Sequence, residues 1–252
     1  MALKAVLYVA GRGSRLGPKY ENSHKILLEF GGKTLLEWHM EHLVKIGAKE
    51  FVVVVGHQRE LVRKKLGDLT SKYPLKVRTI ENLDFREGSV LSFHVSIPEL
   101  EGAQEPILIM DGDVLYPTDM LRQLLSSKHR TALLIDREYS TADDDPVLVP
   151  IKRGKPIDFR KKWTGEADQV GESIGFFKVD PADLPFLIEQ TKKRATGPGR
   201  QDSYDDVLRE MVLAGRFGHE DVTRLPWTEI DFPGDIEKAE REVLPAILKL
   251  GR

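Results

Sequence analysis

A glycine-rich loop near the amino terminus carries the residue types that bind phosphate groups. The segment Val9-Ala-Gly-Arg-Gly-Ser-Arg-Leu-Gly17 directly follows the apolar run Ala5–Val9, and Lys25 comes a few residues later. Its first two glycines let the backbone approach a ligand closely and adopt positive φ angles. Successive backbone N–H groups in such a turn form an anion-binding concavity. Arg15 and Lys25 can add positive charge where negative charge develops on phosphorus.

The loop by itself leaves other interpretations open. It is not a Walker loop, because no Gly-Lys-Ser/Thr follows at the required spacing. A variant dinucleotide fingerprint, Gly11-x-Gly13-x-x-x-Gly17, has its third glycine one place late and lacks the acidic ribose partner after the second strand. An ordinary strand-to-helix turn with surface arginines remains an alternative.

Two acidic pairs supply candidate metal ligands. Asp111-Gly-Asp113 ends an apolar strand, where open α/β sheets carry functional side chains. Two such carboxylates can hold Mg²⁺ through oxygen, whereas a polar Asp-Gly turn explains only one of them. In Glu229-Ile-Asp231 the alternation places both carboxylates on one face of a short strand. We expect Asp235 to cap the following helix, which leaves Asp231 for metal.

Two polar residues follow the third predicted strand. Asn82 comes directly after that strand, and Ser89 opens the next helix. Both can hydrogen-bond a base or a ribose, although Asn82 is equally well explained as an ordinary loop residue.

The elements that must position these residues alternate between strand and helix in the first half of the chain. Apolar β-branched runs predict strands at 5–9, 51–55, 76–80, 106–110 and 131–135. Helical periodicity predicts helices at 34–46, 58–66, 89–97 and 118–127. This order predicts an α/β fold of the Rossmann-like, doubly wound type, with a mostly parallel mixed sheet.

The pattern changes after residue 136. We expect a turn at 143–146, a hairpin of 147–151 with 157–160, a strand at 173–179, helices at 183–193 and 204–214, a short strand at 229–232 and a final helix at 236–250. The prediction is therefore one domain. Its parts are a nucleotide-binding core at 1–136, a smaller α+β acceptor-binding insertion at 137–228 that covers the carboxyl edge of the sheet, and a return strand and C-terminal helix at 229–252.

Composition limits the classes of function. Of the 252 residues, 40% are hydrophobic and 31% charged, as in a soluble globular protein. A net charge of −2 gives no general attraction to nucleic acid. The absence of cysteine excludes disulfides and thiolate metal sites, and it fits a cytoplasmic protein. We expect no signal peptide and no membrane insertion.

Taken together, the motifs resemble the nucleotidyltransferases that couple a nucleoside triphosphate to a small phosphate ester. The matching features run from about residue 4 to residue 245: Ala10–Arg15, Lys25 before Leu27-Leu28, Gly31–Leu35, the Asp-x-Asp at 111–113, and Asp231. Within that superfamily the chain most resembles the phosphocholine cytidylyltransferase branch, which includes phosphonate enzymes, on the segments Ser23–Lys25, Gly171–Gly175, Asp202–Asp206 and Trp227–Asp231. Sugar-specific members usually carry Pro-Lys where this chain has His24-Lys25, which favours a small acceptor over a hexose.

The resemblance implies a Mg²⁺-dependent transfer of CMP from CTP to phosphocholine, phosphoethanolamine or 2-aminoethylphosphonate, with release of pyrophosphate. Arg15 and Lys25 would be catalytic, and Asp113 and Asp231 would hold the Mg²⁺. The nucleotide-binding residues would be Ala10, Gly11, Gly13, Ser14, Arg15, Asn82, Ser89 and Asp111.

An acceptor with an ammonium head group needs acidic or aromatic walls. The second half offers Glu172, Tyr204, Asp206, Trp227 and Glu229. The aromatic members are equally well explained as core or interface residues, so Glu172 is the preferred candidate.

Two other functions stay open. One is a sugar-1-phosphate or inositol-1-phosphate nucleotidyltransferase, and the other is a catalytically silent nucleotide sensor. The expected partners are CTP and a small phosphate or phosphonate. The oligomeric state is left open, with a homodimer as one arrangement.

Overall fold

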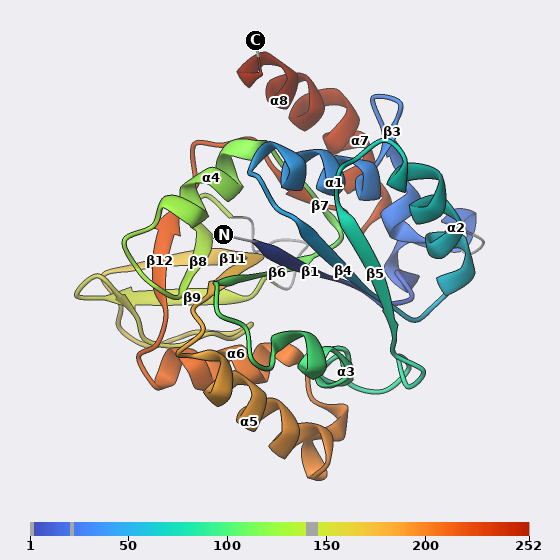
Figure 1. The fold of residues 1–252 in the computed structure, drawn as a ribbon. Coiled ribbons are helices and arrows are strands. Elements are labelled where there is room, and N and C mark those ends of the chain that lie inside the picture. Colours follow the sequence, from blue (N-terminus) through green and yellow to red (C-terminus); the bar gives the residue numbers. More distant parts are fainter. Residues whose placement is uncertain (1–2, 21–22, 140–145, 252) are drawn as a thin grey trace. The chain divides into compact units, whose positions relative to one another are not determined.

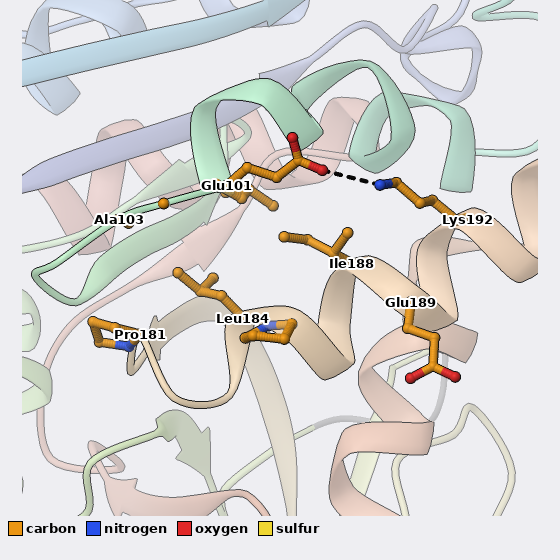
Figure 2. Close-up of a pocket in the computed structure, with 10 residues that line it drawn as sticks. Glu101, Ala103, Pro181, Leu184, Ile188, Glu189 and Lys192 are labelled. Carbon is orange, nitrogen blue, oxygen red and sulfur yellow. Dashed lines mark hydrogen bonds and ion pairs between the residues drawn. The ribbon is translucent and has the colours of Figure 1, made fainter.

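The structure, a computed structural model, describes residues 3–20, 23–139 and 146–251 (Figure 1). The expected turn at 143–146 lies outside the described residues except for Pro146. By its internal contacts the chain divides into two compact units. The first combines Met1–Phe85, Met110–Arg122 and Arg224–Arg252, and the second combines Arg86–Ile109 and Gln123–Thr223.

Three parallel strands form the centre of the first unit. Strand β4 (Glu50–Val55) lies between β1 (Lys4–Val9) and β5 (Lys76–Glu81), so that Val9 pairs with Val55 and Val55 pairs with Glu81 (Figure 1). The apolar residues of β1 and β4 are buried on both sides of the sheet, which explains why their sequences are continuous apolar runs. All three strands therefore end at the same edge, directly before the glycine-rich loop, Gly56 and Asn82.

The remaining elements of the first unit are short strands, single 3-10 turns and helices. They are η1 (Ser14–Leu16), η2 (Pro18–Tyr20), η3 (Lys25–Leu27), β2 (Glu29–Phe30), β3 (Lys33–Thr34), α1 (Leu35–Lys45), α2 (Arg59–Thr70), β7 (Val114–Leu115), β13 (Thr228–Glu229), α7 (Pro233–Lys238), the π-helical turn η5 (Ala239–Val243) and α8 (Leu244–Leu250). Strands β7 and β13 pair in antiparallel fashion. That pairing joins two parts of the chain that are more than a hundred residues apart in sequence.

The second unit contains the antiparallel part of the sheet. Strand β11 (Gln169–Val179) is antiparallel to both β8 (Ala132–Asp136) and β9 (Leu148–Lys152), and β12 (Gly218–Asp221) is parallel to β8. Helices α3 (Val90–Leu100), α5 (Leu184–Ala195) and α6 (Tyr204–Leu213) pack against one another (Figure 1). The unit also holds β10 (Lys155–Pro156) and η4 (Pro198–Gln201). Strand β6 (Ile107–Asp111) and helix α4 (Thr118–Ser126) each have residues in both units.

The predicted α/β class with a mostly parallel mixed sheet is confirmed. Most expected elements differ from the observed ones by a few residues at their ends. The range 137–228, expected to bind the acceptor, divides into 137–223 in the second unit and 224–228 in the first. Its acceptor-binding role stays a prediction. Among the described residues, no helix combines the length and the apolar character needed to cross a bilayer.

Three local expectations differ from the structure. The hairpin after β9 turns on Arg153 and Gly154, whose φ angles of 52° and 72° suit a two-residue turn, so its second strand begins at β10, earlier than expected. The expected partner segment 157–160 continues the antiparallel pairing, with Arg160 opposite Leu148. Strand β12 was missed because Gly-His-Glu-Asp contains no apolar run. The last helix begins earlier than expected, and it has a π-helical turn at 239–243 just before Pro245, which has no N–H to donate.

Candidate active site

Lys25 lies at the centre of a charged cluster in the first unit. Its Nζ donates to Asp113 Oδ2 at 2.7 Å and to Asp231 Oδ1 at 2.6 Å. Arg15 Nη2 donates to the other oxygen of Asp231 at 2.5 Å. The two predicted catalytic cations and the two predicted metal ligands are therefore brought together, and Arg15 and Lys25 are ion-paired with the carboxylates.

The backbone around the two aspartates fixes their separation. In the β7–β13 ribbon Val114 pairs with Glu229, and the amide of Ile230 donates to the Asp113 carbonyl at 2.9 Å. Asp113 thus lies opposite Ile230, the residue immediately before Asp231 on the adjacent backbone segment.

The start of helix α7 holds the other side of Asp231. Asp235 Oδ2 accepts the amides of Asp231 and Phe232 at 2.8 and 2.7 Å. Asp235 therefore stabilises the helix start, as predicted, but from the third position of the helix and not as its N-cap residue. The Asp231 side chain remains available to Lys25 and Arg15.

The charges of the cluster influence one another strongly. Burial alone would lower the pKa of Lys25, but Asp113 and Asp231 raise it above its ordinary value. Burial would raise the pKa of Asp231, and Lys25 followed by Arg15 lowers it. Lys25 is thus a firmly protonated ammonium, and Asp231 is a carboxylate.

Glu229 completes a group of three carboxylates. One oxygen each from Asp113, Glu229 and Asp231 lie within 4.8 Å of one another. Glu229 is exposed as a residue. Packing around its carboxyl group, together with the charges of Asp113 and Asp231, raises its pKa well above the ordinary value.

These residues fit a hard divalent cation. Such a cation takes oxygen ligands from one or two carboxylates and keeps sites for water and phosphate. Asp113 Oδ1 is buried, and among the described residues no group donates a hydrogen bond to it. A carboxylate with an orphaned oxygen, grouped with two further carboxylates, provides the oxygen donors that Mg²⁺ prefers. Asp113 and Asp231 would hold the ion, and Glu229 is a third candidate that sequence reasoning had assigned to the acceptor.

The glycine-rich loop forms one wall of a cleft beside this cluster. The cleft has a volume of about 260 Å³ and is lined by Tyr8, Val9, Gly11, Gly13, Ser14, Arg15, His24, Lys25, Ile26, Gly112, Asp113 and Asp231. Gly13 has a φ of 60°, which favours glycine, and among the described residues a Cβ on Gly11 would meet no atom within 4 Å. Neither a positive φ nor a close contact with these residues requires glycine at position 11, and close approach of a ligand there stays a prediction.

The other predicted nucleotide-binding residues have structural partners. The Ala10 carbonyl accepts the His57 amide at 3.0 Å. Asn82 is buried, and its Oδ1 accepts the amide of Asp84 at 3.0 Å, as in an Asx turn. In the second unit the Ser89 hydroxyl accepts the amide of Tyr204 at 3.0 Å. Asp111 ends β6, and its charge acts on Glu229. Nucleotide binding by these four residues stays a prediction.

The predicted acceptor residues divide between the two units. Trp227 and Glu229 belong to the first unit, and Glu172, Tyr204 and Asp206 belong to the second. Glu172 lies in the middle strand β11, opposite Leu148 on one side and Asp136 on the other.

The two candidates on helix α6 have structural roles. The Tyr204 ring stacks on Phe93 with centroids 4.8 Å apart. Asp206 Oδ2 accepts the amide of Ser203 in a capping box. Acceptor binding by these residues stays a prediction.

Two buried histidines near the cluster were not assigned a role from the sequence. His24 bonds to Val9, and His39 Nε2 lies 3.2 Å from the Gly112 carbonyl in the Asp-Gly-Asp turn. The segment Ser23–Lys25 drew attention to His24, but nothing in the sequence pointed to hydrogen bonds from either ring to the backbone.

The chain matches a known protein family and known relatives. Residues 5–172 match the MobA-like NTP transferase domain. The CMP-5'-(3-aminopropyl)phosphonate synthase of Streptomyces rubellomurinus is 28% identical over 262 aligned residues, covering 96% of this chain. This chain spans only 39% of the length of that relative.

Two solved structures share the fold. The inositol-1-phosphate CTP transferase from T. maritima has a TM-score of 0.77 at 23% identity, covering 99% of this chain and 96% of that one. The CTP:phosphocholine cytidylyltransferase from Streptococcus pneumoniae has a TM-score of 0.72 at 20% identity, covering 95% and 98%. The predicted resemblance to nucleotidyltransferases is thus confirmed. Because the family match covers more than half of the sequence and the fold agrees along nearly all of it, this chain belongs to the MobA-like NTP transferase family.

Proposed function

We propose that this protein is a Mg²⁺-dependent cytidylyltransferase that transfers CMP from CTP to a small phosphate or phosphonate and releases pyrophosphate. One observation carries the proposal. Lys25 Nζ is held between Asp113 and Asp231 at 2.7 and 2.6 Å, on the wall of a cleft that the glycine-rich loop also lines. Such a site places cationic and metal-binding groups beside a loop whose backbone amides can bind phosphate.

The chemistry requires positioning and charge stabilisation. An oxygen of the acceptor phosphate forms a bond to the α-phosphorus of CTP, and the bond to the oxygen that bridges the α- and β-phosphorus atoms breaks. That oxygen leaves with the pyrophosphate. The attacking oxygen is already anionic, so no general base has to remove a proton. Catalysis then depends on alignment and on cations placed where negative charge develops.

Each residue of the cluster has a role in this step. The amides of the glycine-rich loop and Arg15 would bind the β- and γ-phosphates, and Lys25 would stabilise charge on the α-phosphate. Asp113 and Asp231 would hold Mg²⁺, with Glu229 as a third candidate ligand. When bound, the ion would neutralise charge on the triphosphate and on the acceptor phosphate. The predicted domain roles, with the acceptor bound by part of 137–228, belong to the same proposal.

Support for a cytidine nucleotide comes from the similar proteins. The names of the three proteins described above refer to CMP or CTP. Their acceptors differ, and two of them carry an amino or quaternary ammonium group. We therefore favour an aminoalkyl phosphonate or an amino-alcohol phosphate, with Glu172 as the residue that faces its cation.

Inositol 1-phosphate is the second candidate acceptor. It is favoured by the structural likeness to the inositol-1-phosphate CTP transferase, which covers 99% of this chain. A neutral polyol offers no cation for Glu172, so the two candidates predict different effects of the same substitution.

Pyrophosphate release tests the proposal. The four common ribonucleoside triphosphates would each be assayed with Mg²⁺ against phosphocholine, phosphoethanolamine, 2-aminoethylphosphonate, inositol 1-phosphate and glucose 1-phosphate. We expect CTP with an aminoalkyl acceptor to be turned over fastest. Glu172→Gln should then raise the KM for the acceptor far more than the KM for CTP. No release with any pair would indicate a nucleotide sensor, and full turnover by Lys25→Ala would contradict the mechanism.

A further inference from the structure

His24, immediately before Lys25, forms hydrogen bonds to the backbone through both of its ring nitrogens. The side chain is almost entirely buried. Its Nδ1 accepts the amide of Ile26 at 3.2 Å, and its Nε2 lies 2.8 Å from the carbonyl oxygen of Val9. Because a carbonyl only accepts, Nε2 carries the proton and Nδ1 carries the lone pair. The imidazole is therefore neutral and has a fixed tautomer.

The two backbone partners belong to two different parts of the site. Val9 is the last residue of β1 and immediately precedes the glycine-rich loop. Ile26 lies in the 3-10 turn η3, which begins at Lys25 and has His24 as its N-cap. The ring thus joins the lysine-bearing turn to the end of the central strand. A Cβ on Gly13 would lie 3.5 Å from Lys25 Cβ, so the lysine is also packed closely against the loop.

The neutral state of His24 suits this bridging role. Burial lowers its pKa to about 4, although the hydrogen bond to Val9 opposes the change. An uncharged ring next to Lys25 adds no positive charge to compete with the ammonium for Asp113. A protonated ring would also lose its capping bond, because its Nδ1 could no longer accept the Ile26 amide.

We propose that His24 is a positioning residue for Lys25, in that its two backbone hydrogen bonds fix the lysine turn against the end of β1 and so place the ammonium between Asp113 and Asp231. This inference rests on the proposed function only through the activity readout. Both hydrogen bonds of the ring go to backbone atoms, so its effect passes through Lys25.

Three substitutions separate the two hydrogen bonds. In His24→Asn the amide oxygen lies near the position of Nδ1, so it can still cap the Ile26 amide but cannot reach Val9. In His24→Gln the amide group extends to the position of Nε2, so it can still donate to the Val9 carbonyl but is badly placed to accept the Ile26 amide. His24→Ala loses both bonds. Thermal unfolding of each variant would be measured first, and the Asn and Gln variants keep the test decisive if the Ala variant does not fold.

The activity of these variants should fall without a matching loss of CTP binding. A displacement of about 1 Å at a catalytic group costs on the order of 10²-fold, so we expect kcat to fall about 10- to 100-fold in His24→Ala, with KM for CTP nearly unchanged. His24→Asn and His24→Gln should each be intermediate. In the Lys25→Ala background the His24 substitutions should have almost no further effect on kcat, because the group they position is gone.

Several results would overturn the inference. These are wild-type kcat in both His24→Asn and His24→Gln, or an equal fractional loss of kcat with and without Lys25, which would indicate a general loss of structure. The imidazole nitrogen NMR spectrum of the wild-type protein is a readout independent of turnover, and it should show His24 protonated at Nε2 alone at neutral pH. If the wild-type protein turns over no substrate pair, the proposed function fails. The NMR result then still decides whether the bridge exists, and a protonated Nδ1 would reject it.

Discussion

The amide of Ile230 donates a hydrogen bond of 2.9 Å to the carbonyl oxygen of Asp113. This one bond connects the Asp-Gly-Asp turn after β6 to the acidic segment after β13, which is more than a hundred residues away in sequence. It brings Asp113 and Asp231 to the two sides of Lys25. The candidate metal site therefore lies at the end of a short pair of antiparallel strands.

Removal of one carboxylate should abolish most activity without unfolding the protein. We expect Asp113→Asn to lower kcat by about 10²- to 10³-fold, the usual cost of losing a preorganised electrostatic group. The melting temperature should change little, because the loss of the ion pair with Lys25 is offset by relief of the repulsion among the three carboxylates. Titration of activity with Mg²⁺ should require much more metal. Asp119→Asn, which removes a surface ion pair with Arg122 outside the cluster, is the matched control.

The two arginines of the glycine-rich loop should differ in importance. Arg15 contacts Asp231 and lies over the Phe232 ring at 5.2 Å from its centroid, whereas Arg12 is exposed and does not line the cleft. Arg15→Ala should lower kcat/KM for CTP by about 10- to 100-fold, as loss of a charge-assisted contact to phosphate does. Arg12→Ala should change it by less than about threefold. Equal losses would mean that the loop acts only through its overall charge.

Substitution by alanine should have different effects on stability at Gly112 and at Gly11. A Cβ on Gly112 would lie 2.2 Å from Val9 Cγ1, so Gly112→Ala must displace either β1 or the Asp-Gly-Asp turn. We expect a loss of about 1–3 kcal/mol in the free energy of unfolding, as in other overpacked cores. In Gly11→Ala the new Cβ meets no atom of the described residues within 4 Å, so the substitution should leave stability unchanged while raising the KM for CTP. Urea unfolding and steady-state kinetics on both variants would check this, and an unaltered stability of Gly112→Ala would be incompatible with the packing described.

Besides His24, the buried residues His39 and His42 should make the stability of the protein sensitive to acid. Burial lowers the pKa of His39 to about 4 and that of His42 to about 3, from 6.5 in the unfolded chain. Between 6.5 and about 4 the unfolded state binds more protons than the native state, so stability falls as the pH is lowered. Each histidine should contribute about 1.4 kcal/mol per pH unit in that window.

Urea unfolding at a series of pH values would measure this dependence. His42→Asn should reduce the slope of the free energy of unfolding against pH by the contribution of one histidine. The asparagine amide cannot take up the proton that the imidazole binds in the unfolded state. The asparagine side-chain amide can still hydrogen-bond to Thr118, whose Oγ1 lies 2.7 Å from His42 Nδ1. A slope identical to that of the wild-type protein would show that His42 does not contribute.

The strands and the charged residues of the site could be predicted from sequence because both have local signatures. Continuous apolar runs identified β1 and β4, and Asp113 was noticed because it follows such a run. That Lys25 and the two aspartates meet depends on long-range pairing, which only the family resemblance suggested. The role of His24 was missed because a hydrogen bond from a ring to a backbone carbonyl fifteen residues away has no signature in the sequence.

Errors in the secondary structure occurred where local rules conflicted. Arg153 adopts a positive φ that glycine would normally supply, so the tight hairpin was taken for a longer loop. Alternation along a strand gives a face but not the identity of the neighbour on that face, so the approach of Glu229 to Asp113 and Asp231 had no sequence signature. Acceptor binding by Glu229 stays a prediction.

The hydrogen bonds from Asp231 and Phe232 to Asp235 have a consequence for binding at a distance. The amide of Asp231 is hydrogen-bonded to Asp235 in the first turn of α7, so occupancy of the cluster and fraying of that helix are thermodynamically linked. A ligand that immobilises the Asp231 carboxylate should slow hydrogen exchange in α7. By the same reciprocity, a substitution that loosens α7 should weaken metal and nucleotide affinity without contacting either one.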